Sequence, residues 1–345
     1  MTLKCFEIAT TINAKTLWLP NKETIVNLEI KVTVGQIIKC NYYTNDIDNQ
    51  PGDQPIRVLY NLIESEFLSI KESLNQLQPN QNIGNVKLEF LTENVKVIGP
   101  RTNGLKITLH DTFLSFLWAY IYSIIVTSPM GGKEVSIEEN FEASELRKYA
   151  LGLMQEFSQW EKELMPNPEL FGKDENRFIC VTNVVFILSV RFILMHEFAH
   201  IFLKHPFVPV KLMTHENIKK MEVDADNIAI EWALQTLKYE DEFSGKLSLI
   251  TALNSLSFSP NKFSNSYSHP SPEDRIEVCL QRLNLEDCDF LWGYAIWSIM
   301  EWQTNHELFH LPLTFKTGES FKKHFYDMIF ELKEYKRTGI NKFNK

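Results

Sequence analysis

The chain has 345 residues, of which 44% are hydrophobic, so it is long and apolar enough to bury a large core. Its 35 Lys and Arg residues against 44 Asp and Glu residues give a formal net charge of −9, which argues against a nucleic-acid partner. The five cysteines are scattered and never form a CxxC pair, which argues against a cysteine metal cluster and is typical of a reducing compartment. Because the N-terminus also lacks the apolar stretch of a signal peptide, we expect a cytoplasmic protein.

The first hundred residues are expected to mix strands with one helix. Residues 23–43 are rich in β-branched side chains. Residues 45–55 are rich in Asn, Asp, Pro and Gly, which is typical of a loop and here of a subdomain boundary. Apolar side chains recur at spacings of three and four through residues 57–77, which predicts an amphipathic helix. The pattern then alternates through residues 85–110, where we expect two or three strands.

After His110 the pattern is almost entirely helical, and the breaks carry Pro or Gly. The expected helices cover residues 111–127, 138–163, 177–204, 215–238, 247–257, 272–283, 291–305 and 319–336. The fold class that follows is α+β, with a small N-terminal strand layer packed on a large, mainly helical body. Three apolar runs fall short of the roughly 20 uninterrupted apolar residues of a membrane span, so we expect core helices and no span, at residues 113–126, 181–195 and 291–300.

Residues 196–200 read HEFAH, an HExxH motif inside an apolar helical stretch. Residues four apart lie one above the other on a helix, so His196 and His200 can hold one metal ion together, with Glu197 beside them. In HExxH peptidases two imidazoles bind Zn²⁺, which polarises the scissile carbonyl, and the glutamate takes a proton from the attacking water. A chance match to so short a motif is the alternative, and the sequence context has to decide.

A catalytic zinc ion needs a third protein ligand and an open fourth position. His205 is close in sequence, but the metzincin pattern HExxHxxGxxH would require glycine at Leu203 and histidine at Pro206. We therefore interpret His205 as a histidine at the end of the helix, where the helix dipole favours a positive charge, and not as a ligand.

The better candidate for the third ligand lies in the next predicted helix. Glu222 and Asp226 are four apart and share one face, and three alanines offer a flank for close helix packing, at positions 225, 229 and 233. Glu222 would complete a set of two histidines and one glutamate that suits zinc, while Asp226 would hydrogen-bond a ligand imidazole. A solvated acidic face is the alternative, which the apolar neighbours of these carboxylates disfavour.

A third motif, SHPSPEDRI at residues 268–276, joins a stiff proline turn to a predicted helix. His269 on this turn could donate a hydrogen bond to the oxyanion of a tetrahedral intermediate, and Arg275 could fix the turn against an active-site carboxylate. A His-Pro turn is more often structural, so spacing alone leaves the role of His269 open.

Taken together, HEFAH, then EVDAD at residues 222–226, then HPSPEDRI resemble gluzincin-like peptidases of the HtpX type, which pair HExxH with a downstream ExxxD and often an HPxxxxRI turn. The narrower resemblance is to the Lit phage-exclusion peptidases, and it also includes the frame HEFAHIFLKHP and the ending ESFKKHFYDMIFELK. The resemblance implies zinc ligands at His196, His200 and Glu222, catalysis by Glu197, and support from Asp226, His269 and Arg275.

The resemblance extends over about residues 85–335, so we predict two parts of the chain. Residues 1–84 would form a mixed α/β extension of unknown role, and residues 85–345 a zincin-like metallopeptidase domain. HtpX-type peptidases are embedded in membranes, and the lack of convincing spans here favours the Lit-like interpretation.

Lit-type peptidases cleave translation elongation factor Tu during phage infection when a phage capsid peptide is present. The resemblance therefore implies a zinc endopeptidase of bacterial antiphage defence with one catalytic Zn²⁺, elongation factor Tu as the substrate and a phage-derived peptide as the activator. One alternative is a zinc protease that acts on another regulatory protein, such as a repressor or an antitoxin. Another is a noncatalytic binding protein in which zinc only holds helices together, although structural zinc sites are closed and usually cysteine-rich.

Overall fold

The structure is a computed structural model of this chain, and it describes residues 13–14, 28–29, 59–77, 83–91, 99–127, 137–155, 177–237, 242–256, 269–305 and 320–338. The predicted loop at residues 45–55 lies outside the described residues, as does most of the segment at residues 23–43. Within that part of the chain, β1 (Asn13–Ala14) and β2 (Leu28–Glu29) pair in antiparallel fashion. The division into residues 1–84 and 85–345 stays a prediction.

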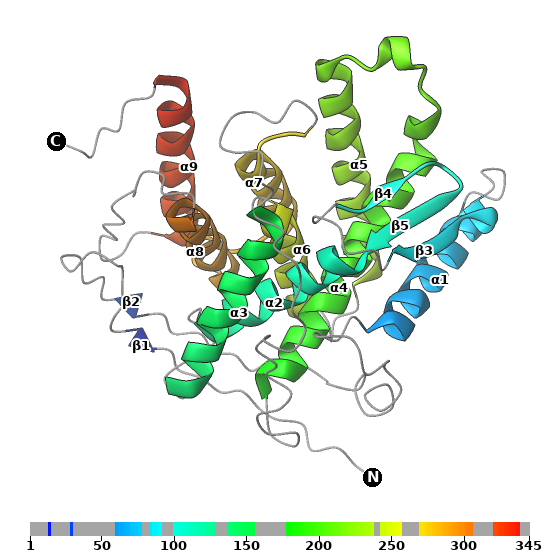
Figure 1. The fold of residues 1–345 in the computed structure, drawn as a ribbon. Coiled ribbons are helices and arrows are strands. Elements are labelled where there is room, and N and C mark those ends of the chain that lie inside the picture. Colours follow the sequence, from blue (N-terminus) through cyan, green and yellow to red (C-terminus); the bar gives the residue numbers. More distant parts are fainter. Residues whose placement is uncertain are drawn as a thin grey trace.

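The described structure is a small sheet on a large helical body, which confirms the α+β class (Figure 1). The helices are α1 (Tyr60–Leu77), α2 (Asp111–Thr127), α3 (Ile137–Gln155), α4 (Arg177–Phe202), α5 (His215–Thr236), α6 (Glu242–Ser255), α7 (Pro272–Arg282), α8 (Phe290–Asn305) and α9 (Phe321–Thr338). Short 3₁₀ turns occur at η3 (Ile83–Asn85), η7 (His205–Phe207) and η8 (Val210–Leu212). Each predicted helix is therefore present within the described residues, with shifts of a few residues at several ends. The predicted end of the helix at 138–163, residues 156–163, lies outside the described residues.

The sheet has three strands in the order β3-β5-β4, which confirms the prediction of two or three strands in residues 85–110. Strands β3 (Lys87–Leu91) and β5 (Lys106–His110) are parallel, while β4 (Arg101–Thr102) is antiparallel to β5 and forms one edge. A tight turn joins β4 to β5, and Gly104 lies in it at a φ of 88°, a conformation that favours glycine.

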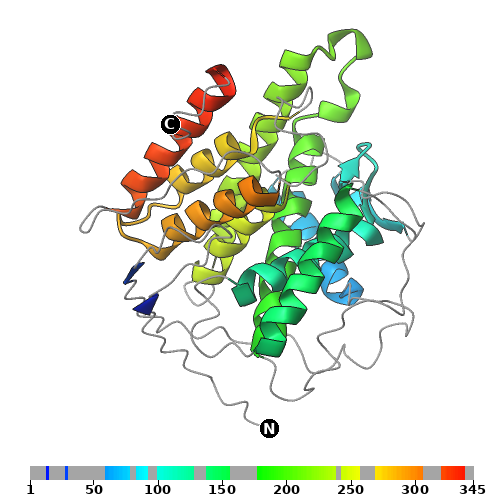
Figure 2. The same cartoon turned by 60° about the vertical axis from the view of Figure 1, so that its left-hand side comes forward.

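Helix α4 is the central element, with the sheet on one side and α8 and α9 on the other (Figures 1 and 2). Phe198 of α4 stacks on Phe67 of α1 with ring centroids 5.4 Å apart. Asn183 accepts a hydrogen bond of 2.7 Å from the buried indole of Trp118 on α2. These contacts fix the helix that carries the HExxH motif from two sides.

The length argument against a membrane span does not hold for α4 as a whole. The predicted apolar run ended at residue 195, but the helix continues through the HExxH motif, and its 22 residues Val181–Phe202 are long and apolar enough to cross a membrane. However, 83% of its most apolar window is buried inside the described structure. This burial, and not the length, gives α4 the environment of a core helix.

Two helix ends differ from the predictions for local reasons. Helix α4 stops at Phe202, because Lys204 adopts a left-handed φ of 61° and Pro206 follows in η7. Helix α6 begins at Glu242, five residues before the predicted start. Gly245 in its first turns obscured the helical pattern, and a Cβ there would lie 2.0 Å from Leu237 Cδ2, so glycine lets the end of α5 pack closely.

Helix α9 is joined to α7 by ion pairs. Lys333 Nζ lies 2.7 Å from Asp274 Oδ1 and 2.8 Å from Glu277 Oε2. Lys336 pairs with the buried carboxylate of Glu273, which lies one turn before Glu277 on α7. The C-terminal helix therefore contacts the same helix that carries Arg275.

Candidate active site

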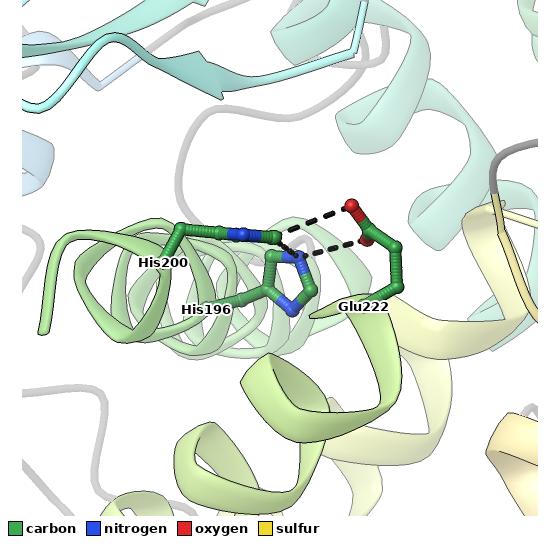
Figure 3. Close-up of side chains that lie close together, drawn as sticks. All are labelled: His196, His200 and Glu222. Atoms are coloured by element: carbon green, nitrogen blue, oxygen red, sulfur yellow. Dashed lines mark hydrogen bonds and ion pairs between the residues drawn. The ribbon is translucent and has the colours of Figure 1, made fainter. Parts of the chain in front are cut away.

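His196 and His200 of α4 converge with Glu222 of α5 (Figure 3). The Nε2 atoms of the two histidines are 3.0 Å apart, and they lie 3.4 Å and 3.5 Å from the Oε2 and Oε1 atoms of Glu222. One potential ligand atom from each residue lies within 4.8 Å of the others. The structure thus brings together the three residues that the sequence predicted as metal ligands.

This cluster has the dimensions and the donor set of a tetrahedral zinc site. Bonds of about 2.05 Å at tetrahedral angles place neighbouring ligand atoms about 3.3 Å apart. The three observed separations lie between 3.0 Å and 3.5 Å. Two imidazole nitrogens and one carboxylate are also the donor set of some catalytic zinc sites, in which the fourth position is left for water or substrate.

Close packing of α5 on α4 puts Glu222 in reach of the histidines. Helix α5 packs mainly against α4, and the three predicted small residues are all buried along it, Ala225, Ala229 and Ala233. Thr214 caps the start of α5 by accepting a hydrogen bond of 3.3 Å from the backbone N–H of Asn217. Small side chains let the axes of two helices come close together. The Glu222 side chain on α5 can then reach His196 and His200 on α4.

Asp226 contacts both His196 and Arg275. Its Oδ1 lies 2.9 Å from His196 Nδ1, while Arg275 donates hydrogen bonds of 2.7 Å from Nε to Oδ2 and of 2.7 Å from a terminal guanidinium nitrogen to Oδ1. Burial alone would raise the pKa of Asp226, but the charge of Arg275 and the hydrogen bond with His196 hold it well below its usual range. Asp226 is therefore an anion that orients the ring of His196 through its second nitrogen.

The carboxylates also set the charge of the cluster. Burial disfavours a charged His196, but its hydrogen bonds with Asp226 and Glu222 outweigh this effect and raise its pKa to about 10. Burial opposes ionisation of Glu222 as well, yet the two histidines hold its pKa well below the ordinary value. The position between these groups therefore favours positive charge, which a divalent cation would also supply.

Glu197 is buried beside the cluster, with 6% of its surface exposed. Burial raises the pKa of its carboxyl, and the negative charge of Glu222 acts in the same direction, while His196 and His200 oppose them. A carboxyl whose pKa is raised above its usual range is suited to accept and release a proton during a reaction.

His269 reaches the cluster from the turn before α7. Its Nε2 lies 3.5 Å from Glu222 Oε2, and half of its side chain is exposed. Burial lowers its pKa, and although the negative charge of Glu222 opposes this effect, the positive charges of Arg275 and His196 add to it, which favours a neutral ring. The structure thus brings His269 to the site, while its role as an oxyanion donor stays a prediction.

One part of the expectation for His205 is wrong: it is not among the residues that could hold a metal ion together, as predicted, but it is not a charged histidine at the end of the helix. It lies in η7 beyond the end of α4 and is 8% exposed, and its Nδ1 is 2.9 Å from Nδ1 of His200. Burial lowers its pKa to about 4, and the neighbouring His200 adds to the effect, so the ring is not a charged partner of the helix dipole. The sequence places Lys-His-Pro just past the second histidine of HExxH, but it does not specify the left-handed backbone at Lys204 that turns His205 towards His200.

The sequence of the chain matches a known peptidase family. The chain belongs to the peptidase U49 family, whose sequence pattern matches residues 107–295, more than half of the chain. The matched region runs from β5 into α8 and contains all the site residues described above.

The chain is also similar to the cell death peptidase of Escherichia coli (strain K12). The two sequences are 25% identical over 193 residues, which cover 50% of this chain and 62% of the relative. The match thus spans less than two thirds of that protein. No solved structure matches the chain.

Proposed function

We propose that the protein is a zinc-dependent endopeptidase whose metal ion is held by His196, His200 and Glu222. The observation that carries this proposal is the convergence of their ligand atoms within 4.8 Å, next to the buried carboxyl of Glu197. Membership of a peptidase family supports the same reaction class. A zinc ion that only held helices together would have no use for a proton acceptor at its open side.

Each remaining residue has a step that fits its position. When bound, zinc supplies a Lewis acid that acidifies water and polarises the scissile carbonyl. Glu197 accepts the proton of the attacking water at its carboxylate and then delivers it to the leaving amide nitrogen. His269 donates a hydrogen bond to the oxyanion that develops on the former carbonyl.

Arg275 acts through Asp226. The arginine holds the carboxylate of Asp226 with two hydrogen bonds, and Asp226 in turn orients His196. Neither residue needs to touch the substrate for this role.

Strand β4 is the best-placed element to bind an extended substrate. It forms one edge of the sheet and contacts α4, the helix with the HExxH motif. We infer that a substrate peptide adds a further strand to this edge, which would place its backbone next to the helix that carries the metal ligands.

We further propose that the substrate is translation elongation factor Tu, that a phage-derived peptide triggers cleavage, and that the reaction takes place in the cytoplasm as part of antiphage defence. The resemblance to the Lit phage-exclusion peptidases supports this, and so does similarity to a relative named as a cell death peptidase. Cleavage of an essential host factor would need such a trigger, because an unregulated protease would kill its own cell.

The test compares cells that carry the wild type with cells that carry Glu197→Gln, before and after phage challenge. Glutamine keeps the size of the side chain but cannot accept the proton, so we expect a shortened elongation factor Tu on a blot only with the wild type. Equal cleavage by both variants would sink the proposed mechanism.

If the blot shows no shortened elongation factor Tu, the proposed substrate is wrong, and another regulatory protein has to be tested as the substrate. Mass spectrometry of new protein N-termini in the same two strains then identifies any fragment that depends on Glu197. A single fragment from a repressor or an antitoxin would retain the peptidase and replace the substrate.

A further inference from the structure

The two ring nitrogens of His200 face different partners. Nε2 points into the cluster, 3.0 Å from His196 Nε2 and 3.5 Å from Glu222 Oε1. Nδ1 points the other way and lies 2.9 Å from Nδ1 of His205. If Nε2 keeps a lone pair for a metal ion, the ring proton of neutral His200 has to sit on Nδ1.

The other histidine of the motif is arranged in the same way but with a different acceptor. Nδ1 of His196 lies 2.9 Å from Asp226 Oδ1, so that ring is oriented by a carboxylate. Nδ1 of His200 has an imidazole in the corresponding place. Metal-binding histidines usually donate their second N–H to a fixed acceptor, and each histidine here has its own.

The chain after α4 is folded so that His205 turns back towards the helix. Lys204 has a left-handed φ of 61°, and η7 is closed by a backbone hydrogen bond of 3.1 Å from Phe207 to Lys204. Phe207 then packs on Gly104 of the β4–β5 turn, where a Cβ would lie 2.5 Å from the ring. The buried His205 ring is thus held by contacts on both sides of its backbone.

We propose that His205 is a positioning residue whose Nδ1 accepts a hydrogen bond from Nδ1–H of His200 and so holds that ring with Nε2 towards the metal ion. This inference rests on the proposed function, because it assigns His205 a task only if His200 is a ligand. His205 itself then carries its proton on Nε2.

The first measurement is zinc affinity of the full chain, by competition with a chromogenic chelator. His205→Phe fills the same space without an acceptor, and we expect its affinity to fall about 10–100-fold. His205→Asn places an amide oxygen near the position of Nδ1, and we expect affinity close to that of the wild type. His200→Ala serves as the reference for a lost ligand, and His215→Phe, at the exposed start of α5, as the control for loss of a histidine elsewhere.

The variants also separate a hydrogen bond from simple packing. Equal affinity of His205→Phe and the wild type would overturn the proposal, and so would equal losses in the Phe and Asn variants. Thermal unfolding of each variant identifies any that has lost its fold, in which case the Asn variant carries the comparison.

The second measurement does not depend on metal. Long-range ¹H–¹⁵N spectra of metal-free protein with ¹⁵N-labelled histidine report which nitrogen of each ring carries the proton, and the His200 signals are assigned by their loss in His200→Ala. We expect the Nδ1–H form of His200 in the wild type and in His205→Asn, and a shift towards the Nε2–H form in His205→Phe. An unchanged tautomer in His205→Phe would overturn the proposal.

Failure of the metal site gives a different pattern. A wild type that binds no more zinc than His200→Ala would refute the proposed function and the metal-binding part of this inference. The tautomer measurement would still decide whether His205 orients His200.

Discussion

At the scale of single residues, Asp226 has two tasks, because its buried carboxylate contacts both Arg275 and His196. It is buried with Arg275, and each side chain is 7% exposed. Removing one partner of a buried ion pair leaves the other charge uncompensated, which is usually more costly than the pair was stabilising. The same carboxylate also orients His196.

We therefore expect Asp226→Asn to lower the free energy of unfolding by about 3–5 kcal/mol and zinc affinity by about 10–100-fold. Urea denaturation and zinc titration measure the two effects. The control is Asp224→Asn on the same helix, which we expect to stay within about 0.5 kcal/mol of the wild type. A double variant, Asp226→Leu with Arg275→Met, should regain stability without regaining zinc affinity, and recovery of both would contradict the role given to Asp226.

Glu66 of α1 offers a test at a site away from the metal cluster. It pairs with Arg191 of α4 at 3.1 Å, but burial raises the pKa of Glu66 above its ordinary value of 4.5 in spite of this charge. The folded protein thus holds this proton more tightly than the unfolded chain does. Wild-type stability should fall as the pH rises from the ordinary value through the raised one, because ionisation then has to occur in the fold.

Glu66→Gln does not titrate in this window, so we expect the stability of the variant relative to the wild type to increase from about pH 4 to about pH 7. Urea denaturation at both pH values measures this difference, and Glu64→Gln on the exposed face of α1 controls for the loss of a carboxylate. A relative stability of Glu66→Gln that decreases with pH would show that the pair with Arg191 outweighs burial.

At the scale of helices, the distance between α4 and α5 decides whether Glu222 can reach the two histidines. Ala229 is fully buried on α5, in the row of small residues that lets the two helices approach. A larger side chain there has to push the helices apart or adopt a strained rotamer. Either response would move Glu222 relative to His196 and His200.

Ala229→Leu is expected to lower the free energy of unfolding by about 1–3 kcal/mol and to weaken zinc binding as well. Denaturation and zinc titration again give the two values. Val223→Leu, at a position that is 41% exposed on the same helix, should change neither. If Ala229→Leu bound zinc as tightly as the wild type, the distance between α4 and α5 would not limit the position of Glu222 as proposed.

The helices were predictable from the sequence because their apolar periods are strong and Pro or Gly marks most breaks. His196 and His200 followed from a spacing of four within one helix, which is local information. Glu222 needed the packing of a second helix, and the alanine row provided the signal for it. The parallel pairing of β3 with β5 and the His200–His205 contact were not predictable, because they depend on distant chain segments and on the left-handed backbone of Lys204.

For the whole molecule, zinc should act as a stabilising ligand of the folded state. A ligand present at 100 times its Kd adds about 2.7 kcal/mol if it binds only the folded chain. An unfolding entropy of about 2.1 cal/mol/K per residue, scaled to the 345 residues of this chain, gives about 1.4 °C per kcal/mol, so the expected rise in Tm is roughly 4 °C. We expect this rise for the wild type after chelator treatment and zinc addition, and none for His200→Ala; equal shifts in both would place the zinc elsewhere.

The shared carboxylate of Asp226 connects the metal cluster to the far side of the molecule. Arg275 anchors α7 to Asp226, and α9 in turn is anchored to α7 by Lys333 and Lys336. We therefore expect an ion bound by His196 to stabilise the contact of Asp226 with Arg275, and we expect the ion pairs between α9 and α7 to stabilise the same contact from the side of α7. The coupling is reciprocal. If a bound metal ion stabilises the packing of α7 and α9 by a given factor, then loss of that packing weakens metal binding by the same factor.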